Sequence, residues 1–534
     1  MAHETLKCNS ENKIYGECPV YVDRLPPCNN ACPAGENIQA WLAKAQAGQY
    51  KEAWEIIMRD NPMPAVHGRV CYHPCEGNCN RKYFDKEVSI HALERFIGDM
   101  AIVEKWSVSN ASSPSGKKVL VVGAGPGGLS AAYHLRLLGH DVTIYEALPI
   151  AGGMMHVGIP DYRLPGDVLA SEVKRIEEMD VKIILNHKVE NLLELKEKNK
   201  FDAVFLAVGA HKGKRIDFEA KNPVPVWDAV DFLRNVKSKT LPKLGDHLLI
   251  YGGSNTAMDV ARSAKRLGVQ NVVIAYHRTR QRMAAFQFEI EEALEEGVEL
   301  KVLRQLRLLE NNIATFNVVE LDAKGSPQPT GEIETIKGDM LVFALGQNPV
   351  TEFLKSVPGI EFKWGANVVV NDQMMTGANG IFAGGDMIPS DQSVTISIGH
   401  GKKAARCIDA FLRGTTYAKA PKHEIATYEM LPLWFQDKAS KMEEKIVDME
   451  TRSKSFDEVV SGIDKTQATF EAKRCFSCGN CFECDGCYAV CPVDAITKLG
   501  PGLRYRYEYD KCIGCRACAE QCPCAAIKMV ECEL

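Results

Sequence analysis

The chain has 534 residues, a formal net charge of −5, 46% hydrophobic residues and 25% charged residues. This composition is ordinary for a globular protein of about three to four domains, and the charge gives no sign of nucleic-acid binding. The sequence begins on polar residues and has no apolar run of about 18 residues, so we expect a cytoplasmic protein without membrane insertion.

Cysteine is the outlying feature of the composition. Of 20 cysteines, seven precede residue 80, twelve follow residue 474, and only Cys407 lies between. In a reducing compartment, such groups indicate metal centres rather than disulfides. Cys407 lies alone in a helical pattern and is predicted to be a buried small hydrophobic residue.

Residues 1–115 read as a helical domain that ends in a small, polar linker, 107–116. Residues 38–58 predict an amphipathic helix, and cysteines lie on both sides of it: Cys28, Cys32, Cys71, Cys75 and Cys79. Such an arrangement fits iron–sulfur or zinc, and the residues leave both open. Cys8 and Cys18 fit no ligand spacing and are expected to be free thiols on an extended arm.

A dinucleotide-binding motif opens the next domain. The apolar run Val119–Val122 meets Gly123, Gly125 and Gly128, and a helical pattern follows. These glycines allow a tight turn, close approach of a pyrophosphate and packing of the helix on the strand. Glu146 ends the next strand about twenty residues on, where an acid accepts hydroxyls of the adenosine ribose.

A second nucleotide fold begins at residues 247–259, where Ser254 replaces the second glycine of the fingerprint. The following strand ends in His277 and Arg278, with more arginines beyond and no acid. Guanidinium groups there favour a 2′-phosphate, so NADP is favoured over NAD. The alternative is a merely solvated basic loop.

Residues 340–418 return to the first fold. The segment 380–386 reads as a buried strand that ends in Gly385 and Asp386, before a helical stretch that starts near Ser393. Asp386 is predicted either to form a turn or to bind the sugar alcohol of a flavin.

Residues 475–534 contain two C-x2-C-x2-C-x3-C-P runs. In such runs four thiolates hold each [4Fe–4S] cluster, and the fourth cysteine of each run binds the other cluster. The spacing therefore assigns one cluster to Cys481, Cys484, Cys487 and Cys522, and the other to Cys512, Cys515, Cys518 and Cys491. Cys524 and Cys532 are left over and are expected to be structural.

Over residues 28–415 the chain resembles the small subunit of glutamate synthase and the N-terminal half of dihydropyrimidine dehydrogenase, with a two-cluster bacterial ferredoxin fused behind it. The motifs are CPAG at 32–35, RVCYHPCEGNC at 69–79, GAGPGG, GIPDYRLP, GGSNTAMD and IFAGGD. The resemblance and the glycine motifs place FAD on Gly123, Gly125, Gly127, Gly128, Glu146, Gly153, Arg163, Gly385, Asp386, Thr395 and Ile396. The nicotinamide nucleotide is expected on Gly252, Gly253, Asn255, Thr256, His277 and Arg278.

The resemblance also implies two N-terminal [4Fe–4S] clusters. One matches Cys32, Cys71 and Cys75, with Glu94 at the position of the family's non-cysteine ligand. The other matches Cys28 and Cys79, but the family's upstream Arg-Cys-x-x-Cys is missing. The only such motif here carries Cys475 and Cys478, so we hypothesise that the C-terminal segment folds back to complete this cluster. Alternatively, Cys8 or Cys18 completes it, or it is absent.

The fold class expected is multidomain, with two Rossmann-like α/β domains, one inserted in the other, between a helical iron–sulfur domain and an α+β ferredoxin domain. The predicted boundaries are 1–115, 117–225 (first FAD segment), 226–345 (NAD(P)), 346–418 (second FAD segment), 419–474 (helical connector) and 475–534. Residues 225–345 contain no cysteine, which excludes disulfide reduction of the thioredoxin-reductase type.

We expect an electron-transfer flavoprotein that exchanges hydride between NAD(P)(H) and FAD and passes single electrons through [4Fe–4S] clusters. By analogy, its partner is a ferredoxin or another subunit of an oxidoreductase complex, such as an enzyme oxidising 2-oxoacids. The alternatives are a glutamate synthase small subunit and a docking module with vestigial nucleotide sites.

Overall fold

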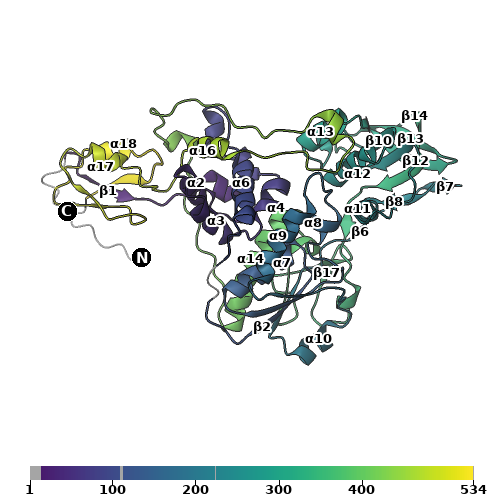
Figure 1. Ribbon diagram of the computed structural model, residues 1–534, viewed down its shortest axis with the longest axis horizontal. Coiled ribbons are helices and arrows are strands. Elements are labelled where there is room, and N and C mark those ends of the chain that lie inside the picture. The colour runs from purple at the N-terminus through teal and green to yellow at the C-terminus, as the bar shows by residue number, and fades with distance from the viewer. Residues whose placement is uncertain (1–13, 109–111, 223, 533–534) are drawn as a thin grey trace. The chain divides into compact units, whose positions relative to one another are not determined.

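The computed structural model describes residues 14–108, 112–222 and 224–532, which form two compact units (Figure 1). We call 14–106, 418–444 and 462–532 the cysteine-rich unit, and 107–417 with 445–461 the sheet unit. Within the described residues, no helix is long and apolar enough to cross a membrane.

The N-terminal portion of the cysteine-rich unit is helical, as expected. Its elements are α1 (Pro27–Ala31), α2 (Ile38–Gln46), α3 (Tyr50–Met58), α4 (Pro64–Val70), α5 (Pro74–Gly77), the 3₁₀ helix η2 (Asn80–Tyr83) and α6 (Ile90–Val103). The single helix expected over 38–58 is wrong, because Gly48 has a φ of +74° and ends α2. Glycine adopts this left-handed conformation without steric cost, so the chain turns there into α3.

Helices α4 and α6 approach each other closely at two glycines. A Cβ on Gly68 would lie 2.4 Å from the backbone of Arg95, and a Cβ on Gly98 would lie 2.3 Å from that of Ala65. Only glycine allows the backbones of α4 and α6 to lie this close, so the facing side chains of the two helices come together.

The C-terminal portion of this unit contains short helices and antiparallel strand pairs, an α+β arrangement. Its elements are α16 (Lys465–Lys473), α17 (Gly486–Val490), β20 (Ile496–Lys498), β21 (Tyr505–Tyr507), α18 (Ala517–Glu520) and β22 (Ile527–Glu531). Strand β1 (Glu17–Tyr21) pairs antiparallel with β22, and a Cys18–Cys532 disulfide joins the two strands. The expectation of a free thiol at Cys18 is therefore wrong, whereas Cys8 lies outside the described residues.

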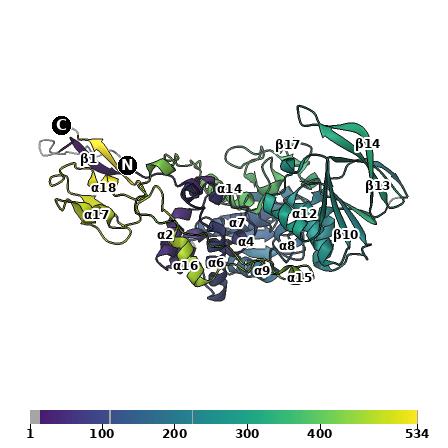
Figure 2. The same ribbon diagram turned by 90° about the horizontal axis from the view of Figure 1, so that it is seen from above.

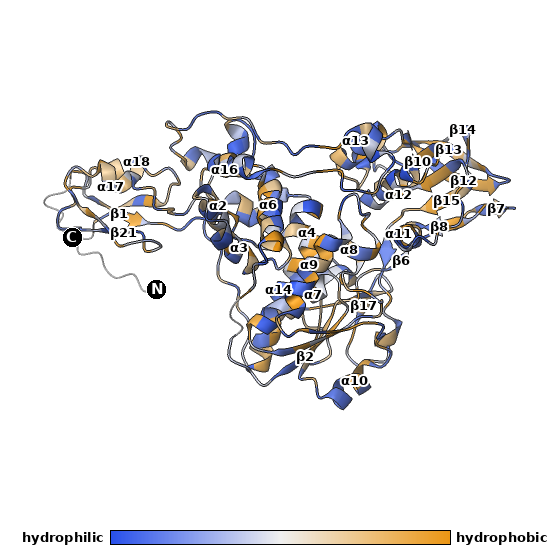
Figure 3. Cartoon of the chain, viewed as in Figure 1, coloured by the Kyte–Doolittle hydropathy of each residue, from blue (hydrophilic) through white to orange (hydrophobic). Residues whose placement is uncertain are grey.

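The sheet unit contains a parallel sheet in the order β19-β5-β2-β3-β4. The strands and main helices are β2 (Lys118–Val122), α7 (Pro126–Leu137), β3 (Asp141–Tyr145), β4 (Lys182–Ile184), β5 (Ala203–Leu206), β19 (Ile381–Ala383) and α14 (Val394–Leu412). Helices α7 and α14 cross where a Cβ on Gly401 would lie 2.3 Å from the carbonyl oxygen of Gly127. Figure 3 shows mostly hydrophilic colour on the largely exposed α10 (Leu192–Asn199).

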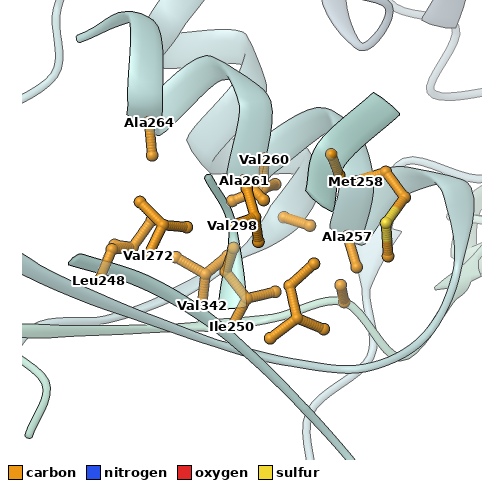
Figure 4. Close-up of a cluster of buried hydrophobic side chains, with 14 of the residues drawn as sticks. Leu248, Ile250, Ala257, Met258, Val260, Ala261, Ala264, Val272, Val298 and Val342 are labelled. Carbon is orange, nitrogen blue, oxygen red and sulfur yellow. The ribbon is translucent and has the colours of Figure 1, made fainter. Parts of the chain in front are cut away.

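A second parallel sheet has the order β11-β10-β9-β15-β8. It comprises β8 (Val226–Asp228), α11 (Ala229–Ser238), β9 (His247–Tyr251), α12 (Asn255–Arg266), β10 (Asn271–Tyr276), α13 (Gln287–Glu295), β11 (Glu299–Val302) and β15 (Met340–Phe343). Helix α12 lies beside β10 of this sheet (Figure 2), and side chains of β9, β10 and β15 pack against Ala257, Val260 and Ala261 of α12 (Figure 4). This packing fixes the start of α12 at the carboxyl end of β9.

Smaller elements complete the sheet unit. An antiparallel sheet is formed by β14 (Pro327–Lys337), β13 (Ile313–Leu321) and β12 (Arg304–Glu310), with β7 (Glu219–Lys221) at its edge. The others are α8 (Met154–Val157), α9 (Gly166–Glu177), β6 (Lys212–Gly213), η3 (Arg280–Arg282), β16 (Gln347–Asn348), η4 (Glu352–Leu354), β17 (Phe362–Lys363), β18 (Asn367–Val368) and η5 (Gly385–Met387).

The segment expected to be a helical connector is largely irregular. Between Tyr417 and α16, the structure has only η6 (Tyr428–Met430) and α15 (Met449–Arg452). The expectation of a mainly helical connector over 419–474 is therefore wrong for this described segment, where polar residues lack an apolar face to bury along a helix.

Candidate functional site

A cavity of about 370 Å³ lies at the carboxyl ends of β2, β3, β5 and β19. Its lining includes most of the residues expected to hold FAD: Gly123, Gly125, Gly127, Glu146, Gly153, Gly385 and Asp386. Glu146 is held at its edge by two backbone donors, Ala124 N at 2.6 Å and Leu148 N at 2.8 Å. The cavity thus combines a glycine turn, an oriented carboxylate and a helix N-terminus, which together suit a dinucleotide.

Two glycines of the turn have different roles. A Cβ on Gly128 would lie 1.9 Å from the carbonyl oxygen of Gly123, so Gly128 serves the packing of α7 on the turn. A Cβ on Gly125 would have only Gly153 Cα, at 4.0 Å, within reach. Gly125 faces the cavity, so its missing side chain leaves room for a pyrophosphate.

This difference predicts separate outcomes for two substitutions. We expect Gly125→Val to retain the fold but to lower bound FAD at least ~10-fold, because the side chain takes the space of the pyrophosphate. Gly128→Ala should instead destabilise the chain by roughly 1–3 kcal/mol or more, because the strand–helix packing must separate. FAD absorbance per chain and thermal unfolding distinguish the two; equal stability losses would contradict the assignment.

Asp386 lies on η5 beside the start of α14. Ser397 Oγ donates to Asp386 Oδ1 at 3.1 Å, and burial raises the pKa of Asp386 to about 6. Ser393 Oγ accepts from Ile396 N at 3.1 Å and caps α14, as the sequence placed its start, and Thr395 is buried in its first turn. A carboxylate here can accept hydrogen bonds from a flavin sugar alcohol.

A pH dependence of FAD affinity follows from this pKa. If the flavin donates hydrogen bonds to ionised Asp386, binding lowers the pKa below about 6, so affinity is highest above that pH. As pH falls through 6, the dissociation constant should rise by up to ~10-fold per pH unit. Fluorescence titration of the flavin-free chain with FAD between pH 5 and 8 measures this dissociation constant. In Asp386→Asn the dissociation constant should not change with pH. The same pH dependence in that variant as in wild type would show that another group causes the effect.

The second glycine motif occupies the turn from β9 to α12. Gly252 has a φ of +148°, and its Cβ would lie 2.2 Å from the carbonyl oxygen of Ala344. A Cβ on Gly253 would lie 2.8 Å from the Tyr276 ring. Asn255 and Thr256 form the first turn of α12, and Asn255 Oδ1 accepts from Phe286 N at 2.9 Å. Serine is accommodated at position 254 because this residue is the N-cap of α12 and its backbone is extended there.

His277 and Arg278 follow β10, beside that turn. Burial and the neighbouring Arg278 lower the pKa of His277, which favours its neutral form. Arg278 Nε is buried and has no hydrogen-bond partner among the described residues. An arginine whose Nε has no such partner can donate a hydrogen bond to an anion such as a phosphate.

Arg163 does not line the cavity at the first sheet in the portion of the chain described. Its guanidinium group binds Asp259 of α12, with both oxygens at 2.9 Å, and Glu289 of α13 at 2.6 Å. The expectation that Arg163 binds FAD rests on the family resemblance, and long-range partners such as Asp259 and Glu289 leave no signal in a local motif.

In the cysteine-rich unit, Cys28, Cys79, Cys475 and Cys478 line one small cavity. Burial and the other three thiols raise the pKa of Cys28 well above its usual range, and burial raises that of Cys475 to about 12. Four thiols that repel one another as thiolates fit a cationic iron–sulfur cluster, which favours the ionised form. Asn80 Nδ2 donates to Cys478 Sγ at 3.5 Å. The hypothesised return of the C-terminal segment to Cys28 and Cys79 is thus present in the fold.

The ferredoxin-like runs also bring together the sets that their spacing assigns. Cys491 lines a cavity with Cys512, Cys515 and Cys518. Burial raises the pKa of Cys487 to about 12, helped by its neighbours Cys481, Cys522 and Cys484. The buried Cys524 lies beside this second set, with its sulfur 3.7 Å from that of Cys522.

The third cysteine group comprises Cys32, Cys71 and Cys75. Burial raises the pKa of Cys75, helped by the neighbouring Cys71 and Cys32. Glu94 lies beside this group, but its Oε1 contacts His67 Nδ1 at 2.8 Å and accepts from Asn61 Nδ2 at 2.8 Å.

Sequence reasoning missed His67, Asn61 and Glu36, which form a buried polar set around Glu94. Glu36 directly follows CPAG, and His67 lies two residues before the arginine of RVC, so their closeness to the motifs was the available signal. The close approach of α4 and α6 places His67 against Glu94.

Together, the dinucleotide cavity, the second nucleotide turn and the buried cysteine sets define a flavin-dependent oxidoreductase linked to iron–sulfur clusters. The model of the pyridine nucleotide-disulphide oxidoreductase family matches residues 117–404, over half of the chain. Residues 3–106 match dihydropyrimidine dehydrogenase domain II, 4Fe-4S cluster, and residues 480–526 match the 4Fe-4S dicluster domain. The chain therefore belongs to the pyridine nucleotide-disulphide oxidoreductase family and has iron–sulfur domains at both ends.

Curated relatives agree with this family. The chain is 35% identical over 515 residues to the NADPH-Fe(3+) oxidoreductase subunit beta of Geobacter sulfurreducens, covering 86% of this chain and 76% of the relative. It is 33% identical over 501 residues to the NADP(+)-dependent formate dehydrogenase subunit beta of Moorella thermoacetica, covering 85% and 70%. The glutamate synthase [NADPH] small chain of Azospirillum brasilense is 30% identical, covering 74% and 88%. The protein is an electron-transfer flavoprotein subunit of the NAD(P)H oxidoreductase type.

Proposed function

We propose that this chain exchanges hydride between NADP(H) and FAD and relays single electrons through four [4Fe–4S] clusters to or from a partner subunit. The observation that carries the proposal is the presence of four groups of neighbouring thiols in a chain that also has a dinucleotide cavity. Bound FAD would supply the conversion between two-electron and one-electron transfer. The preference for NADP rests on Arg278 and the absence of an acid after β10.

The residues of the chain then have distinct tasks. Glu146 and Asp386 would bind the two sugar groups of FAD, and the amide groups after Gly125 would hold its pyrophosphate. Arg278 would bind the 2′-phosphate, while Gly252 and Gly253 would let the nucleotide approach the backbone. Glu94 would complete the cluster of Cys32, Cys71 and Cys75.

The finer domain plan belongs to this proposal as well. An NAD(P) domain at 226–345 would interrupt an FAD domain at 117–225 and 346–418, between an iron–sulfur domain at 1–115 and a ferredoxin domain beyond 475. The order of the first sheet, in which β19 pairs with β5, supports this plan.

For the partner, we propose another subunit of a soluble oxidoreductase complex or a ferredoxin. Two relatives are named as beta subunits, one of a formate dehydrogenase and one of an Fe(3+) oxidoreductase. An enzyme that oxidises 2-oxoacids through ferredoxin is a further candidate of the same redox class.

Anaerobic titration with NADH and NADPH, followed by absorbance, tests the proposal beside an iron assay. We expect about sixteen irons per chain, four for each cluster, and bleaching of flavin and clusters by NADPH. About eight irons would contradict the N-terminal clusters. A flavin that neither nucleotide bleaches would contradict hydride exchange and favour a docking role.

A further inference from the structure

One part of the connector belongs to the sheet unit, although the residues before and after it belong to the cysteine-rich unit. Residues 445–461, which we call the strap, leave the cysteine-rich unit after Glu444 and rejoin it at Gly462. The strap closes on itself: Val447 N donates to Val459 O at 2.9 Å, and Ser461 N donates to Lys445 O at 2.9 Å. It is therefore an ordered loop, with α15 inside it, rather than a simple linker.

One side of the strap contacts the second nucleotide fold. Arg452 is only 5% exposed, and its Nη2 lies 2.8 Å from a carboxylate oxygen of Glu295 at the end of α13. Arg266 of α12 donates from Nε to the carbonyl oxygen of Ser455 at 3.1 Å. Both helices that carry these contacts, α12 and α13, belong to the second nucleotide fold.

The other side of the strap contacts the GIPDYRLP loop of the first nucleotide fold. Val459 N donates to the carbonyl oxygen of Tyr162 at 3.0 Å, and the rings of Phe456 and Tyr162 lie 6.2 Å apart. Tyr162 is fully buried, and the guanidinium group of Arg266 lies 3.9 Å from its ring centroid.

The same loop joins the two folds directly. Arg163, next to Tyr162, binds Asp259 of α12 and Glu289 of α13. The junction is thus formed by the ion pairs of Arg163, whose buried charges would cost much if left unpaired, and by the contact of a guanidinium group with the Tyr162 ring. The strap covers this junction and contributes Arg452 and Phe456 to it.

We propose that the strap sets the position of the second nucleotide fold, and hence of the nicotinamide, against the flavin cavity. Arg452 is a positioning residue in this proposal, because it holds α13 through Glu295 without lining the flavin cavity in the described structure. The inference rests on the hydride exchange proposed above. Hydride transfer requires reacting atoms about 3–3.5 Å apart, so a shift of about 1 Å between the folds slows it by as much as ~100-fold.

The experiment compares Arg452→Met with wild type in the full chain loaded with FAD and clusters. Methionine keeps the apolar stem but removes the ion pair. Anaerobic stopped-flow reduction by NADPH gives the limiting rate of flavin reduction and the NADPH dissociation constant. We expect the limiting rate to fall at least ~10-fold, with FAD content, flavin midpoint potential and NADPH affinity unchanged. Arg452→Lys should recover some of the rate.

Lys454→Met is the matched control, because Lys454 is exposed near Arg452 and forms an ion pair with Glu450 on the surface. It should leave the limiting rate unchanged. Phe456→Leu loosens the ring contact to Tyr162 from the same strap and should reproduce the effect if Arg452→Met fails to fold.

The possible outcomes separate the two proposals. A wild-type limiting rate in both Arg452→Met and Phe456→Leu would overturn the role of the strap while leaving hydride exchange intact. A parallel loss of FAD, potential and rate in both variants would also overturn it, because the strap would then be merely structural. A wild-type chain that NADPH and NADH both fail to reduce would instead overturn the proposed function itself.

Discussion

Replacing both Cys475 and Cys478 with serine is expected to remove about four irons per chain, the content of one [4Fe–4S] cluster. Both thiols line the same cavity as Cys28 and Cys79, so the substitution leaves two of four ligands. The loss should appear in the iron assay and as reduced cluster absorbance, while the flavin is still bleached by nucleotide. Because the flavin cavity lies wholly in the sheet unit, FAD content should not change.

Cys407→Ser provides the matched control for this double variant. Cys407 is buried in α14, is 2% exposed and belongs to none of the cysteine sets. It should retain all iron, with at most a modest loss of stability from placing a hydroxyl in an apolar site. An unchanged iron count in the Cys475/Cys478 variant would rule out the return of the C-terminal segment as a source of ligands.

Arg278→Ala is expected to raise the KM for NADPH by about 10- to 100-fold and to leave that for NADH nearly unchanged. A hydrogen bond to a charged group contributes about 1.5–3 kcal/mol, and every 1.4 kcal/mol is a factor of ten in affinity. The buried Nε of Arg278, which lacks a hydrogen-bond partner among the described residues, is the group that a 2′-phosphate would engage. Steady-state reduction of an artificial acceptor with each nucleotide gives the two KM values and therefore their ratio.

Arg304→Ala is the comparison for that variant, because Arg304 lies on β12 and already binds Glu334 at 2.5 Å. Its preference between NADPH and NADH should match wild type. Equal changes with NADPH and NADH in Arg278→Ala would show that this arginine does not read the 2′-phosphate, and would remove the argument for NADP over NAD.

Both nucleotide motifs were predictable because each is local. Strand β2, the turn at Gly123 and helix α7 follow one another in sequence, and the close packing at Gly128 needs only neighbouring residues. The break at Gly48 was missed although it is also local, because the apolar periodicity continues through it. Periodicity shows which face of a helical segment is buried, but it does not show whether the segment is one helix or two.

The sequence by itself determined the two glycine turns, the start of α14 and the sorting of cysteines in the ferredoxin-like runs. These features depend on spacing within short segments, where φ/ψ preferences and ligand geometry act directly. Only the tertiary structure decided that Cys475 and Cys478 meet Cys28 and Cys79, that Cys18 pairs with Cys532, and that Arg163 binds Asp259 and Glu289. These contacts join residues far apart in the chain, and the packing of whole helices and strands, rather than any local preference, brings them together.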